Sequence, residues 1–245
     1  MSARRVLRAG GLYFDGRSAL AVVQPFTVYG WKEITIAEWV YPYWPKVRTV
    51  MAYFSMIGDL WYDGIATLIV AGAPAEYPYL RVDFRTRKPD GTSKNYSYDI
   101  TGYRNSWVHL VRRFKPSREF SVWVNGEKKY SVTIPTEEVT VLERNPDDAP
   151  YPLYYKRFTL GGSTRFDDRM RVAYSEICIY NRALTTDEVR AIYERGALIR
   201  DGLVLHLDFS EGEGNIAYDK SGCGNHATIY GARWVVKKPL RVLQR

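Results

Sequence analysis

The stretch DGLVLHLDFSEGEGNIAYDKSGCGNHATIYGARW, residues 201–234, decides the fold. Large apolar residues alternate with other residues at its start, at Leu203, Leu205, Leu207 and Phe209. This two-residue period is typical of a strand with one face in a core. An acidic, glycine-rich turn at 211–214 and a turn-forming cluster at 219–225 follow. The strand-like segment 227–230 comes next, so the stretch predicts a strand, two turns and a second strand.

The rest of the chain carries the same kind of pattern. Asn125-Gly126 favours a two-residue hairpin turn. One short helix is predicted near 185–195, because Thr185 or Thr186 can cap it and Gly196 can end it. Many short strands with one helix are typical of an all-β sandwich. The predicted strands are 12–15, 19–23, 34–42, 50–57, 65–70, 79–86, 107–114, 120–125, 129–134, 158–160 and 174–180.

Four further stretches carry a family resemblance. They are LYFDG (12–16), ITIAEWVYP (34–42), WVHLVRRF followed by FSVWVNGE (107–114 and 120–127) and YSEICIYNRALTTDEVRAIYERG (174–196). Together with the opening stretch they resemble a laminin-G-like domain of the concanavalin A-like lectin and glucanase superfamily. The resemblance implies an all-β, concanavalin A-like jelly-roll β-sandwich of two antiparallel sheets.

The order of these stretches differs from the family order. In the family, the strand and loop that resemble 201–234 come first, whereas here they come last. The resemblance therefore implies a circularly permuted, single laminin-G-like domain over 1–245, with 201–234 forming the family's usual N-terminal strand and loop. We expect Leu203–Phe209 to lie beside the strand at 12–16, because the first and last strands of a sandwich are neighbours. The alternative is that 201–245 completes the sheet of a neighbouring copy and the protein polymerises.

The composition indicates which partners the protein favours and what kind of organism it comes from. The 245 residues carry a net charge of +8, with 24 Arg against 11 Lys. This charge favours anionic partners, but nucleic acid is not expected, because no nucleic-acid reading motif is present. The basic cluster Arg112, Arg113, Lys115 and Arg118 is interpreted as solvated surface. Few Gln and Met with many Tyr are typical of a thermophile.

Membrane and export signals are not found in the sequence. No apolar run approaches the roughly 20 residues that cross a bilayer, so no membrane insertion is expected. Residues 1–11 lack the apolar core of a signal peptide. The resemblance nevertheless implies an extracellular, cell-surface or virion location. Cys178 and Cys223 could form one disulfide or remain unpaired, and the sequence leaves this open.

Aromatic residues in predicted turns are the candidate carbohydrate-binding residues. Lectin-type binding needs exposed aromatic rings that stack on sugar faces, with polar groups beside them for the hydroxyls. Loop aromatics more often seal the ends of a sandwich or form subunit contacts, so the set is more informative than any one ring. The candidates are Trp44, Trp61, Tyr62, Tyr77, Tyr79 and Tyr154.

Catalytic carboxylates are not predicted. Glycoside hydrolases need two carboxyl groups that face one bond, and no strand here carries clustered acids. Glu38 and Glu176 are the nearest candidates, since each interrupts an otherwise apolar strand. For Glu38 we expect a structural role at the end of the core, paired with an arginine. The chain is therefore predicted not to be an enzyme.

A calcium site is implied by the family resemblance. Asp219, Ser221 and Asn225 could supply the hard oxygen ligands that calcium prefers. In such loops Asp and Asn usually bond to their own backbone, which is the alternative here. His109, His206 and His226 have no spacing of a metal site and are expected to be structural.

The preferred hypothesis is a non-enzymatic binding module of a cell or virus surface that recognises glycans or proteins through loop aromatics. One alternative is a structural, self-assembling subunit of a virion or filament, in which the same aromatics form contacts of a homo-oligomer. A carbohydrate-active enzyme is the other alternative.

Overall fold

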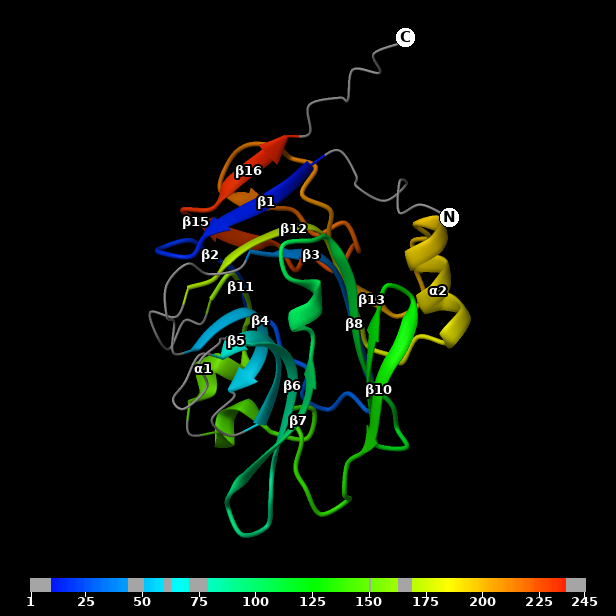
Figure 1. Cartoon of the computed structure of the whole chain (residues 1–245). Helices are drawn as coiled ribbons and strands as arrows, with labels where there is room; N and C mark the ends of the chain where they lie inside the picture. The colour runs from blue at the N-terminus through cyan, green and yellow to red at the C-terminus, as the bar shows by residue number, and fades with distance from the viewer. Residues whose placement is uncertain are drawn as a thin grey trace.

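Two antiparallel eight-stranded sheets form the protein (Figure 1). The computed structural model describes residues 10–43, 51–59, 63–70, 79–149, 151–162 and 169–236. The predicted all-β sandwich of two antiparallel sheets is confirmed. Helices are few in the described part of the chain: α1 (Pro152–Tyr155), α2 (Thr186–Arg195) and the 3-10 turns η1 (Thr101–Tyr103) and η2 (Pro146–Asp148).

The first sheet, sheet A, has the strand order β10-β9-β8-β3-β12-β1-β16, and β13 also pairs with β12. Its strands are β1 (Gly10–Asp15), β3 (Ile34–Pro42), β8 (Val108–Phe114), β9 (Glu119–Val124), β10 (Glu127–Thr133), β12 (Arg171–Tyr180), β13 (Leu203–Leu207) and β16 (Arg233–Val236).

The second sheet, sheet B, has the order β14-β15-β2-β11-β4-β5-β6-β7. Its strands are β2 (Leu20–Val23), β4 (Met51–Asp59), β5 (Asp63–Val70), β6 (Tyr79–Arg87), β7 (Ser93–Asp99), β11 (Phe158–Leu160), β14 (Ile216–Ala217) and β15 (Ala227–Tyr230). The inner faces of both sheets form one apolar core, in which the Phe84 ring of sheet B stacks on Phe114 and Phe120 of sheet A.

The core also contains a buried ion pair. Arg112 Nη2 lies 3.0 Å from Glu38 Oε1, and both side chains are about 1% exposed. Thr67 Oγ1 of sheet B donates to the same carboxylate oxygen, so Glu38 points between the sheets. The expected arginine partner of Glu38 is therefore present.

Two residues of the basic cluster, Arg112 and Arg113 of β8, are not the solvated surface that the sequence suggested. Successive strand residues face opposite sides, so Arg112 points into the core while Arg113 points to the outer face of sheet A. There Arg113 lies over the Trp123 ring and donates through Nη1 to the Leu184 carbonyl at 2.6 Å. Both arginines are buried. Arg112 lies between the two sheets, and Arg113 lies under the segment that leads into α2.

Helix α2 covers the outer face of sheet A beside β8 and β13 (Figure 1). Thr185 Oγ1 accepts the amide of Glu188, and the Glu188 carboxylate accepts the amide of Thr185, which is a capping box. Gly196 ends the helix in the left-handed conformation at φ +63°. The predicted cap and stop are both confirmed.

A buried aromatic group with one histidine lies under the end of α2. The His109 ring lies 5.1 Å from the Trp39 ring and 5.9 Å from the Tyr193 ring of the helix. Its two ring nitrogens are buried and have no hydrogen-bond partner among the described residues. Burial lowers the pKa of His109 from 6.5 to about 3. The imidazole is therefore neutral in the folded protein at neutral pH.

The C-terminal stretch enters both sheets of its own chain. β13 pairs with β12, β15 with β2 and β16 with β1. The prediction that Leu203–Phe209 lies beside the 12–16 strand was wrong. Both β1 and β13 pair with β12, at 171–174 and at 177–180, so they lie end to end. A Cβ at Gly10 would lie 2.4 Å from the Phe209 carbonyl oxygen, which shows how closely the two strand ends meet.

Candidate ligand-binding pocket

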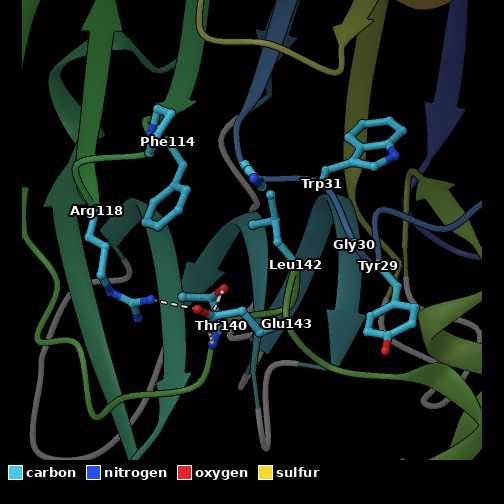
Figure 2. A pocket seen from close by; sticks show the side chains of 10 residues that line it. Tyr29, Gly30, Trp31, Phe114, Arg118, Thr140, Leu142 and Glu143 are labelled. Carbon is cyan, nitrogen blue, oxygen red and sulfur yellow. Dashed lines mark hydrogen bonds and ion pairs between the residues drawn. The ribbon is translucent and has the colours of Figure 1, made fainter.

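A pocket of about 440 Å³ lies where β8 ends and β3 begins. Figure 2 shows Tyr29 and Trp31 on one side of it and Phe114 and Arg118 on the other, with Thr140, Leu142 and Glu143 between them. Its volume lies within the range of roughly 300–1,000 Å³ that is common for ligand sites. The residues that line the pocket are Tyr29, Gly30, Trp31, Lys32, Phe114, Pro116, Arg118, Thr140, Leu142 and Glu143.

The aromatic side is held by a glycine turn. Gly30 has φ +84°, a conformation that favours glycine, and its amide donates to the Leu142 carbonyl at 2.8 Å. This bond ties the turn to the pocket floor, where Leu142 is buried. The Trp31 ring packs edge-on against Phe26 at 6.2 Å. Tyr29 is 47% exposed, so one ring is anchored and the other is open to a ligand.

The opposite side presents an oriented charge pair. Arg118 Nη1 lies 2.5 Å from Glu143 Oε1. Glu143 Oε2 accepts from both the amide and the hydroxyl of Thr140, so both oxygens of the carboxylate accept hydrogen bonds. Arg118 also donates to the carbonyls of Ile134 and Glu138. A guanidinium has five N–H donors and three are used here, so two remain for a ligand.

The pocket carries a net positive charge. Lys32 and Arg118 contribute two cations against the single carboxylate of Glu143. Among the described residues no acid lies within ion-pair distance of Lys32, and the Tyr29 hydroxyl makes no hydrogen bond. Donors outnumber open acceptors, so the site suits a ligand with oxygen acceptors or an acidic group.

The structure does not bring the predicted aromatics together at a described site. Trp44, Trp61, Tyr62 and Tyr77 lie outside the described residues. Tyr79 begins β6 and its backbone pairs with Val70. Tyr154 lies in the single helical turn α1.

Tyr43, which follows β3, packs with neighbouring aromatic rings on the outer face of sheet A. Tyr43 lies 4.5 Å from Tyr41 and 5.6 Å from Tyr13, measured between ring centroids. Arg171 covers the Tyr43 ring at 4.7 Å, and Trp107 packs edge-on against Tyr41. Burial, with Tyr41 and Tyr13 nearby, raises the pKa of Tyr43. These rings contact one another and seal this part of the sheet.

The predicted calcium residues do meet, but as a hydrogen-bonded turn. Asp219 Oδ1 accepts the amides of His206 and Ser221, and Oδ2 accepts the Ser221 hydroxyl and the Asn225 amide. Burial opposes ionisation of Asp219, but these hydrogen bonds outweigh it and lower the pKa. Asn225 Nδ2 donates to the Val204 carbonyl.

This arrangement does not fit calcium, because both carboxylate oxygens face N–H or O–H donors and calcium needs six to eight oxygen ligands. Calcium binding at Asp219, Ser221 and Asn225 stays a prediction.

The two candidate carboxylates lie on opposite faces of sheet A. Glu38 points into the core and is paired with Arg112. Glu176 points to the outer face, where its Oε1 lies 3.0 Å from His206 Nε2. Two carboxyl groups separated by a sheet cannot act on one glycosidic bond.

A comparison with known families shows to which superfamily the chain belongs. A family model described as the concanavalin A-like lectin/glucanases superfamily matches residues 14–190. The chain belongs to that superfamily. The predicted resemblance is confirmed, and no curated protein matches this member of the concanavalin A-like superfamily.

Solved structures share the concanavalin A-like fold at low sequence identity. A Bacteroides ovatus protein, to which carbohydrate binding is ascribed, is 15% identical with a TM-score of 0.63, over 94% of this chain and 60% of its own. The ligand-binding domain of botulinum neurotoxin serotype D with N-acetylneuraminic acid is 13% identical with a TM-score of 0.51, over 80% and 44%. A heptameric pentraxin from Limulus polyphemus is 13% identical with a TM-score of 0.50, over 78% and 85%.

The sequence interpretation missed Tyr29 and Trp31. Both satisfy the criterion that selected the other aromatics, since they flank Gly30 between two predicted strands. The signal was present, but Arg118 and Glu143 come from distant loops, so only the fold shows that these residues share a pocket. Within the described residues, no helix is both long and apolar enough to span a bilayer.

Proposed function

We propose that the protein is a non-enzymatic, glycan-binding module and that its ligand lies in the pocket between Trp31 and Arg118. The observation that carries the proposal is one concave site in which the exposed Tyr29 ring and the half-buried Trp31 ring lie opposite unused donors of Arg118. Tyr29 and Trp31 offer apolar ring faces that can stack on a sugar, while Arg118 and Lys32 can bind its oxygens.

The charge of the pocket narrows the ligand class. The one carboxylate, Glu143, already accepts from Arg118 and Thr140. The remaining polar groups are donors and two of them are cations. An acidic glycan, with carboxylate or sulfate groups, therefore fits better than a neutral one.

The fold neighbours are consistent with this proposal. Carbohydrate binding is ascribed to the Bacteroides ovatus protein, and the neurotoxin domain was crystallised with N-acetylneuraminic acid. As part of the proposal we place the module outside the cell, on a cell surface or on a virion, where glycans are displayed.

A glycan array with acidic and neutral members, followed by calorimetric titration of the best ligand, tests the proposal. We expect binding to acidic glycans, with Y29A and W31A each weakening it about tenfold through loss of one stacking ring. Y230A is the matched control, because Tyr230 is 51% exposed and lies outside the pocket. Its affinity should equal that of the wild type.

Equal affinity of the wild type, Y29A and W31A for a bound glycan would exclude this pocket, and no binding on the array would exclude a glycan ligand. Repeating the titration with a chelator tests the separate calcium prediction. Loss of glycan binding with the chelator would mean that binding needs a metal ion, and it would contradict binding through Tyr29, Trp31 and Arg118 alone.

A further inference from the structure

Three side chains with metal-binding groups meet on the outer face of sheet A, away from the pocket. Glu176 and Cys178 are two residues apart in β12, so they point to the same side. His206 of β13 is the direct register partner of Cys178. Only the pairing of β13 with β12 brings these residues together, across a separation of 28 residues or more in the chain.

The distances suit a shared ligand. His206 Nε2 lies 3.0 Å from Glu176 Oε1, and the ligand atoms of all three residues lie within 4.8 Å of one another. Bond lengths of 2.0–2.3 Å place the ligand atoms of a tetrahedral zinc ion roughly 3.3–3.8 Å apart. Small side-chain rotations are therefore enough to bring the three atoms onto one cation.

Burial and charge favour a divalent cation. Glu176, Cys178 and His206 are 7%, 5% and 3% exposed. A carboxylate and a thiolate carry two negative charges, which a divalent cation neutralises together with a neutral imidazole. One sulfur, one nitrogen and one oxygen donor suit zinc and similar transition metals, not calcium or magnesium.

Backbone hydrogen bonds and the contact with Glu176 hold His206 in place. The His206 amide donates to Asp219 Oδ1 at 2.9 Å, and its carbonyl accepts the Lys220 amide at 2.8 Å. The ring nitrogen Nδ1 is buried and has no hydrogen-bond partner among the described residues. The other ring nitrogen, Nε2, lies 3.0 Å from Glu176 Oε1 and so already points toward the proposed cation.

We propose that Glu176, Cys178 and His206 bind a divalent cation of the zinc class, with the fourth position open to water. The ion would join β12 to β13 and so fasten the C-terminal stretch to the body of the sheet. This site is separate from the glycan pocket and adjoins the predicted calcium loop, because the His206 amide donates to Asp219.

Cobalt titration of the full chain tests the site, because a thiolate bound to Co²⁺ gives a charge-transfer absorption that oxygen ligands do not. After removal of metals with a chelator, the wild type should develop this band with one equivalent of Co²⁺. Zn²⁺ should abolish the band and raise Tm. The band should persist in C223S, in which Cys178 is the only cysteine, and disappear in C178S.

E176Q keeps the shape of the side chain and is a second test of the metal site if C178S does not fold. Because it loses a ligand, we expect at least about tenfold weaker zinc binding. H226Q, which alters an exposed histidine, should bind as the wild type does. A folded wild type without the cobalt band would overturn the proposal, as would a band that is lost in C223S but kept in C178S.

Discussion

The buried His109 should make the stability of the protein fall between pH 7 and pH 5. In the unfolded chain the imidazole has a pKa near 6.5, whereas in the folded protein burial lowers the pKa to about 3. Between these values the unfolded state binds one more proton than the folded state. The free energy of unfolding therefore falls as the pH drops below 6.5 and goes on falling to about pH 3.

The size of this loss follows from the two pKa values. At full effect the slope is about 1.4 kcal/mol per pH unit. Between pH 7 and pH 5 the contribution of His109 is about 2 kcal/mol, because the unfolded imidazole is only partly protonated in the upper part of this range. The folded imidazole has no hydrogen-bond partner for a proton among the described residues, and it packs beside the stacked rings of Trp39 and Tyr193.

Urea unfolding of the wild type and H109F at pH 7 and pH 5 measures this contribution. Phenylalanine keeps an aromatic ring beside Trp39 and Tyr193 and removes the titrating group. The wild type should lose about 2 kcal/mol more than H109F over this range. H226Q, at an exposed histidine, controls for the loss of any histidine. Equal losses in the wild type and H109F would refute the reasoning.

Three further changes test the fold. E38Q should lower the free energy of unfolding, measured with urea, by about 3–5 kcal/mol, because it leaves the buried Arg112 without its charged partner. Recovery of stability in an E38L/R112M double variant would show that the unpaired charge is the cause. T185A should remove the cap of α2 and lower stability by about 1 kcal/mol, measured as a fall in Tm. G126A should destabilise more than G222A in the same assay: both glycines have positive φ, but a Cβ at 126 would lie 2.7 Å from a tyrosine ring of α2, whereas one at 222 has open space.

Local patterns in the sequence were enough for the sandwich and most of its elements, although β7 and β16 were not predicted. Alternating apolar residues predicted the strands, Asn125-Gly126 predicted the β9–β10 hairpin, and Thr185 with Gly196 predicted the bounds of α2. These features depend on neighbours along the chain, such as a turn residue or a cap three positions away. A single sequence contains all of that information.

The candidate sites depend on contacts between distant segments. Trp31 and Arg118 line one pocket because β3 and β8 are paired strands, and the loop that carries Glu143 closes it. Cys178 meets His206 because β13 pairs with β12, whereas the sequence had suggested the 12–16 strand as the neighbour.

The sequence by itself determined that this chain forms an all-β sandwich, because strand periodicity, turns and caps are local properties, and its motifs resembled those of the concanavalin A-like superfamily. Only the tertiary structure decided which charges are buried, which aromatic rings border a pocket and which side chains can share a metal ion. Adjacent residues such as Arg112 and Arg113 have the same local chemistry, and the packing of the second sheet and of α2 gives them different partners.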